Sequence, residues 1–97
     1  MRNGYGKSLF NTEDGTCYNC GYVGDTARHE PIHGARRKLS KKYGLWIAVC
    51  PRCHDLMHKH ESDSFYYLKE DAQRLFMNEY NVSVEDFIKL FGKSYIE

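Results

Sequence analysis

Two Cys-x-x-Cys pairs, Cys17/Cys20 and Cys50/Cys53, constrain this 97-residue chain more than any other feature of its sequence. A chain of this length forms one domain at most, and its core is near the lower size limit for stability without a cross-link. Four thiolates presented by two such turns complete a tetrahedral zinc site and leave no open position. We therefore predict a structural zinc ion with Cys17, Cys20, Cys50 and Cys53 as its ligands.

In a secreted protein of this size the same cysteines would form two disulfides. The first six residues lack the apolar region of a signal peptide. No apolar run approaches the roughly 18 residues of a membrane span. The composition, 41% hydrophobic and 28% charged, is typical of a globular chain. We therefore expect a soluble cytoplasmic protein with no membrane partner, in which zinc takes the place of disulfides.

The net charge of +1 conceals an uneven distribution of charge. Residues 28–60 contain eight basic and two acidic residues, whereas residues 61–97 contain four basic and eight acidic residues. A basic centre between the two cysteine pairs indicates a polyanionic partner, with an ordinary solvated loop as the alternative. The candidate nucleic-acid-binding residues are Arg36, Arg37, Lys38, Lys41 and Lys42.

The pattern of apolar residues predicts a small, zinc-stapled α+β fold. A short strand should lead into the segment that begins at Arg28, and the apolar run 45–49 should form a buried strand. Because proline suits the first turn of a helix, a helix should run from Pro51 to about Lys59. Residues 35–44, between these strands, are basic and are expected to be mobile.

The C-terminal third is expected to contain two helices. The first should begin after Ser62 or Asp63 and end at Asn81, and the second should begin after Ser83 and end at Gly92. The side chains expected to be buried are Leu68, Ala72, Leu75, Phe76 and Tyr80 in the first helix and Phe87, Ile88 and Phe91 in the second. The organisation is then an N-terminal arm (1–16), a zinc-containing core (17–60) and a C-terminal helical extension (61–97) packed on that core.

Two histidines follow the second cysteine pair on the helix expected there. His54 comes directly after Cys53, and His58 lies four residues further on, so both imidazoles can reach one cation. His60 lies about 240° around the helix from His54 and should point elsewhere. The segment His29-Glu30-Pro31-Ile32-His33 also matches the His-Glu-x-x-His pattern of zinc peptidases. That pattern requires a continuous helix, which Pro31 does not allow, so we reject the peptidase interpretation.

Together these residues resemble the HNH nuclease family, which has a ββα-metal fold. The matching features are the first cysteine pair, the histidine-bearing dipeptide His29-Glu30 after a short strand, an apolar strand, and the second cysteine pair running into a helix with His54 and His58. The segments Arg37-Lys38-Leu39-Ser40 and Lys42-Tyr43-Gly44-Leu45, with the ending Phe91-Gly92-Lys93-Ser94-Tyr95, are similar to small HNH-type proteins common in bacteriophage genomes. The resemblance covers residues 17–96.

The resemblance implies a second divalent ion (Mg²⁺, Mn²⁺, Ni²⁺ or Zn²⁺) held by His29, His54 and His58. It also places Glu30 in the position of the general base, where the family normally has histidine. Two alternatives remain open for the base, His29 itself and His33. The asparagine that normally orients the base is missing, because no Asn lies between Asn19 and Asn78.

The activity implied by the resemblance is metal-dependent hydrolysis of phosphodiester bonds in DNA, with RNA as a further candidate substrate. A phage-encoded protein of this kind would act in the cytoplasm of the bacterial host, as a monomer or a homodimer. One alternative is a non-catalytic, zinc-stapled module that binds nucleic acid or protein. Another is a thiol redox protein that uses the two Cys-x-x-Cys pairs.

Overall fold

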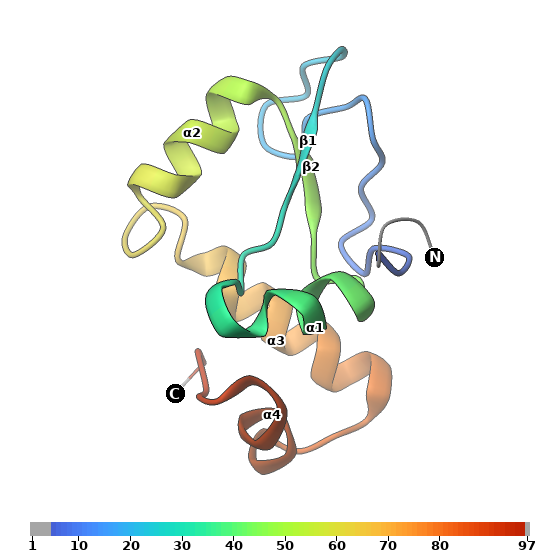
Figure 1. Ribbon diagram of the computed structural model, residues 1–97, viewed down its shortest axis with the longest axis vertical. Coiled ribbons are helices and arrows are strands. Elements are labelled where there is room, and N and C mark those ends of the chain that lie inside the picture. The colour runs from blue at the N-terminus through green and yellow to red at the C-terminus, as the bar shows by residue number, and fades with distance from the viewer. Residues whose placement is uncertain (1–4, 97) are drawn as a thin grey trace.

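The computed structural model describes residues 5–96, which form a small α+β fold around one core (Figure 1). Two strands, one 3-10 turn and four α-helices are found within these residues. In chain order the elements are β1 (Ala27–His29), η1 (Gly34–Arg36), α1 (Arg37–Lys42), β2 (Ile47–Val49), α2 (Pro51–Lys59), α3 (Tyr67–Tyr80) and α4 (Val84–Phe91). None of the helices in this part of the chain is long and apolar enough to cross a membrane.

The two strands pair antiparallel, with Ala27 opposite Val49 and His29 opposite Ile47. Every residue from Leu45 to Cys50 is buried, which accounts for the unbroken apolar run in the sequence. The chain passes from β2 through Cys50 directly into α2, which lies beside the sheet (Figure 1). The predicted burial of residues 45–49 and the predicted bounds of α2 are confirmed, but the strand is shorter than predicted and covers only Ile47–Val49.

The prediction that residues 35–44 are mobile is wrong. They contain most of η1 and all of α1. Ser40 is fully buried in α1, and its hydroxyl donates to the carbonyl oxygen of Ile32. The carbonyl oxygen of Ser40 in turn accepts from the backbone N–H of Leu45 at 2.8 Å. These contacts fix a helix of only six residues, although the abundance of exposed basic side chains conceals it in the sequence.

Helix α3 begins at Tyr67 rather than directly after Ser62 or Asp63. The carboxylate of Asp63 accepts from the neighbouring Ser64 N–H and so serves a local turn instead of a helix terminus. The end of α3 at Asn81, which has a left-handed φ of 51°, is as predicted.

Helix α4 is bounded as its sequence predicts. The Ser83 hydroxyl accepts from the Asp86 N–H at 3.2 Å, and Gly92 ends the helix with a φ of 93°. Phe87 and Phe91 stack on each other at 4.6 Å and meet Phe76 of α3.

Two side chains that were expected in the core are exposed, Tyr80 by 46% and Ile88 by 39%. The helical period places both side chains near the edge of the buried face of their helices and not at its centre. The buried stripe of each helix is narrower than the apolar stripe in its sequence. Helix α3 buries Leu68, Ala72, Gln73 and Phe76, and helix α4 buries Phe87 and Phe91.

The described part of the expected N-terminal arm, residues 5–16, lies along the core. Phe10 is buried, and the Leu9 N–H donates to the carbonyl oxygen of Gly44 at 2.8 Å. The indole N–H of Trp46 donates to the carbonyl oxygen of Gly6, also at 2.8 Å. This segment is therefore anchored to the residues that connect α1 to β2, and the Tyr5 ring lies 4.6 Å from the guanidinium of Arg28 in β1.

We expect Gly44→Ala to destabilise the fold more than Gly15→Ala does. Both glycines have positive φ, 78° and 95° respectively, so alanine costs roughly 1–2 kcal/mol of backbone strain at each. A Cβ atom at Gly44 would in addition lie 2.0 Å from the Lys7 carbonyl oxygen, whereas among residues 5–96 only the chain neighbours of Gly15 come within 4 Å of a Cβ atom there. Chemical denaturation of both variants measures the difference. Equal losses of unfolding free energy would show that the close approach at Gly44 is unimportant.

Candidate metal centres

The four cysteines form one cluster in which the sulfur atoms lie within 4.8 Å of one another. Cys17 and Cys20 come from the turn before β1, and Cys50 and Cys53 come from the start of α2. None of these four described cysteines forms a disulfide. The cluster could therefore hold a metal ion such as zinc, as the cysteine spacing predicts.

Backbone hydrogen bonds fix the first cysteine turn against the sheet. The Gly21 N–H donates to the Cys17 carbonyl oxygen at 2.9 Å, and Gly21 has the positive φ of 81° that closes such a turn. The Tyr18 N–H donates to the carbonyl oxygen of Ala48 in β2 at 2.7 Å. The turn is thus held beside the strand that leads to Cys50.

The thiols differ in acidity because their surroundings differ. Burial would raise the pKa of the Cys17 thiol, but backbone hydrogen bonds at Cys50, Cys20 and Asn19 lower it to about 6. Burial raises the pKa of the Cys53 thiol to about 12, and the neighbouring sulfur atoms contribute to the rise. Four thiolates in so small a volume repel one another, so a cation is needed to stabilise the fully deprotonated set.

A second cluster joins His29 of β1 to His54 and His58 of α2. One ring nitrogen from each lies within 4.8 Å of the others, and the Nε2 atoms of His54 and His58 are 3.2 Å apart. The ring of His29 is 5.4 Å from each of the other two, centroid to centroid. The structure therefore brings together the three histidines that the family resemblance groups. His60 is outside this cluster, as predicted, and its Nδ1 pairs with Asp63 at 3.4 Å.

The surroundings of His29 and His54 favour the neutral form of both imidazoles. Burial, followed by the proximity of His54 and His58, lowers the pKa of His29 to about 3. Burial and the neighbouring His58 likewise lower the pKa of His54. A neutral imidazole has the free lone pair that a metal ion requires, so this cluster is suited to a cation that prefers nitrogen ligands.

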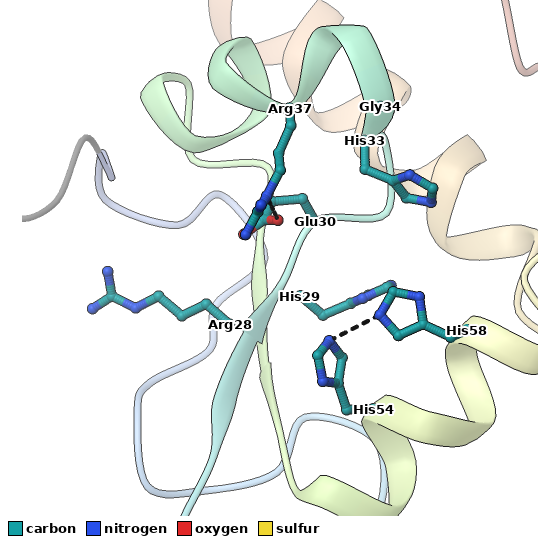
Figure 2. A pocket seen from close by; sticks show the side chains of 8 residues that line it. All are labelled: Arg28, His29, Glu30, His33, Gly34, Arg37, His54 and His58. Carbon is teal, nitrogen blue, oxygen red and sulfur yellow. Dashed lines mark hydrogen bonds and ion pairs between the residues drawn. The ribbon is translucent and has the colours of Figure 1, made fainter.

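The histidine cluster opens into a hollow of about 460 Å³, which Figure 2 shows from close by. Figure 2 shows His29, His54 and His58 directed towards one another from the strand and the helix. The residues that line the hollow are Arg28, His29, Glu30, His33, Gly34, Arg37, His54 and His58.

Glu30 lies in this hollow but turns away from the imidazole rings and towards Arg37 (Figure 2). Its side chain is only 5% exposed. One carboxylate oxygen accepts from the Arg37 Nε–H at 2.8 Å, and the other accepts from the Tyr5 hydroxyl. Both oxygens of the candidate base are therefore engaged by other side chains.

His33, another candidate base, lies at the opposite edge of the hollow. Its ring is 6.4 Å from that of His58, and its Nε2 lies 2.8 Å from Glu61 Oε1. The Lys69 ammonium is 3.5 Å from the same oxygen and donates to the Pro31 carbonyl oxygen at 2.6 Å. Glu61 and Lys69 were not predicted, and no sequence signal points to them, because 28 and 38 residues separate these partners.

The segment between His29 and His33 is not helical, since β1 ends at His29 and the next helical turn starts at Gly34. The two histidines therefore do not share one helix face. The rejection of the peptidase interpretation is consistent with this geometry.

The basic residues of η1 and α1 differ in where their charges lie. Arg37 faces Glu30 in the hollow, whereas the Arg36 guanidinium lies against Gly92 of the C-terminal segment. The Lys41 ammonium is over the ring of Tyr5, and the Lys42 ammonium is over the ring of Tyr43. Lys38 is exposed. Of the five predicted nucleic-acid-binding residues, Arg37 is the one that lines the hollow.

Comparison with known proteins adds no relative to this description, because no family model, no curated protein and no solved structure matches the chain.

We expect Cys50→Ser to prevent stable folding. Structural zinc contributes roughly 10 kcal/mol to the folding of small zinc modules. Domains are stable by only about 5–15 kcal/mol in total, so little or nothing would remain. Circular dichroism melting and elemental zinc analysis measure the result, with the exposed neighbour variant Arg52→Ala as a zinc-containing control. A Cys50→Ser protein that melts cooperatively in excess chelator would refute the structural zinc.

Proposed function

We propose that this protein is a metal-dependent endonuclease of the HNH type that hydrolyses phosphodiester bonds of DNA. The observation that supports the proposal best is the cluster of His29, His54 and His58. It is built from the first of two antiparallel strands and from the helix that follows the second. This order of elements agrees with the resemblance to a ββα-metal fold, and the adjacent cysteine cluster provides the structural support such a small core needs.

The histidine cluster differs from the cysteine cluster in being incomplete as a coordination shell. Three imidazoles beside a hollow leave positions at which water and a phosphate oxygen can bind. A divalent ion bound there would polarise the phosphodiester and stabilise the departing oxygen. Because imidazole suits nickel and zinc better than magnesium, we expect this ion to be Ni²⁺ or Zn²⁺ rather than Mg²⁺.

His33 is the proton acceptor that we favour among the three candidates. His29 is committed to the metal cluster, and both oxygens of Glu30 are engaged by Arg37 and Tyr5. The His33 ring lies beside His58, and Glu61 orients it through a hydrogen bond. An imidazole oriented by a carboxylate is a common arrangement for a general base.

A second candidate function is a non-catalytic module that binds nucleic acid or protein and uses zinc only for stability. The engagement of Glu30 favours it, because a proton acceptor is then missing from the position where the resemblance implies one. Metal content distinguishes the two functions. One tightly held zinc ion and a second, exchangeable ion are expected of the nuclease, and one zinc ion alone is expected of the binding module.

Cleavage of plasmid DNA should depend on an added divalent ion and should be abolished in His29→Ala and His54→Ala. The reason is that these side chains hold the second ion and not the structural zinc. His60→Ala is the matched control, because it removes an imidazole next to the C-terminal end of α2 that lies outside the cluster. Gel analysis with Mg²⁺, Mn²⁺, Ni²⁺ and Zn²⁺ measures cleavage, and elemental analysis measures zinc. Retained cleavage in His54→Ala would contradict the proposed site.

Neutralising Arg36, Arg37 and Lys38 together should weaken DNA binding to a similar extent for unrelated sequences. Phosphate contacts supply affinity that falls as salt rises, with a slope of roughly 0.7–0.9 per contact in a plot of log affinity against log salt. The triple variant should therefore show a shallower slope in fluorescence anisotropy titrations. An unchanged affinity and slope would mean that this basic segment is an ordinary solvated surface.

A further inference from the structure

We propose that Arg37 binds the phosphate next to the histidine cluster and that Glu30 is the positioning residue for Arg37 rather than the proton acceptor. This inference rests on the proposed nucleic-acid substrate. It assigns roles that differ from those the family resemblance implies for the position of Glu30.

The first argument is the geometry of Glu30. Its carboxylate is buried, is directed towards Arg37 and faces away from the three imidazoles (Figure 2). To accept a proton from water at the metal cluster, it would have to break its bonds to Arg37 and Tyr5 and turn around. A buried carboxylate that loses its partners is unfavourable by several kcal/mol, so this rearrangement would oppose catalysis.

The second argument is the asymmetry of the ion pair between Glu30 and Arg37. The Glu30 side chain is 5% exposed, whereas the Arg37 side chain is 57% exposed. Arg37 contacts the carboxylate through Nε, and a guanidinium has five N–H donors in a rigid plane. An arginine anchored in this way still has donors to offer a phosphate, which it can bind in bidentate fashion. The buried partner thus acts as the anchor, and the exposed partner is accessible to the substrate.

The third argument is the role of Tyr5. Burial, together with the hydrogen bond to Glu30, raises the pKa of Tyr5 to about 12, so its hydroxyl keeps the proton that it donates. The ring of Tyr5 also lies 4.6 Å from the Arg28 guanidinium and 5.1 Å from the Lys41 ammonium. Tyr5 therefore holds the carboxylate oxygen of Glu30 that Arg37 Nε does not contact, while the Arg28 guanidinium over its ring is itself paired with Asp14.

Arg36 provides the internal comparison. It is the neighbour of Arg37 and has the same charge, but its guanidinium lies against Gly92 and not against Glu30. A general effect of positive charge on DNA binding would involve both arginines. Energetic coupling to Glu30 should involve only Arg37.

A double-mutant cycle of Glu30→Gln and Arg37→Ala tests the proposal in the full-length protein. Anisotropy titration with a short DNA duplex measures affinity and its salt slope, and single-turnover cleavage measures the rate. Arg37→Ala should weaken binding and reduce the slope by roughly 0.7–0.9. Glu30→Gln retains an oxygen that can accept from Arg37, so its cleavage rate should fall by less than about 10-fold. In the Arg37→Ala background, Glu30→Gln should cause no further loss of cleavage rate, because Glu30 acts through Arg37.

The control cycle combines Glu30→Gln with Arg36→Ala and should be additive. Melting temperature and zinc content show whether each variant is folded. Since the Arg37 side chain is exposed, Arg37 variants remain informative even where a Glu30 variant does not fold. Arg37→Lys should not restore full DNA binding, because lysine lacks the planar guanidinium group.

Two results would overturn the proposal while leaving the nuclease intact. One is a cleavage rate reduced by about 10²–10⁴ in Glu30→Gln with unchanged binding, and by the same factor in the Arg37→Ala background, as a general base requires. The other is an Arg37→Ala protein with wild-type affinity and salt slope. A wild-type protein that neither binds nor cleaves DNA would instead refute the proposed function, and this inference with it.

Discussion

The convergence of four cysteine sulfur atoms at the junction of β2 and α2 determines where the rest of this structure can lie. Cys20 and Cys50 are 30 positions apart in the chain, yet their sulfur atoms are 3.8 Å apart. This contact ties the turn before β1 to the first turn of α2. Because His54 directly follows Cys53, the same constraint brings His54 to the strand that contains His29. The geometry of the histidine cluster is in this sense a consequence of the cysteine cluster.

The two clusters are adjacent but chemically different, and the difference follows from their donor sets. Four sulfur donors enclose a position on all sides, whereas three imidazoles leave one side open to a hollow that also contains Arg37. The closed cluster is suited to stability and the open cluster to chemistry. The proposed nuclease activity needs both clusters, because an ion enclosed by four cysteines has no open position for a substrate.

Local structure was largely predictable where short-range rules govern it. The start of α2 at Pro51, the cap of α4 at Ser83 and the left-handed end of α3 at Asn81 each depend on one or a few neighbouring residues. The sequence was misleading where tertiary contacts outweigh local pattern. Helix α1 depends on the buried hydroxyl of Ser40, which bonds to Ile32, and Tyr80 is exposed although it falls on the apolar stripe of α3.

The sequence by itself determined each Cys-x-x-Cys pair and the pairing of His54 with His58, because these follow from fixed spacings within a turn or a helix. Only the tertiary structure decided that His29 joins that pair, since it places β1 against α2. It also decided that Glu30 faces Arg37 and Tyr5 and that His33 faces Glu61. Glu30 is 25 residues from Tyr5, and His33 is 28 residues from Glu61. Contacts between residues so far apart produce no periodicity or motif in a single sequence, so the chemistry of the hollow could be read only from the folded chain.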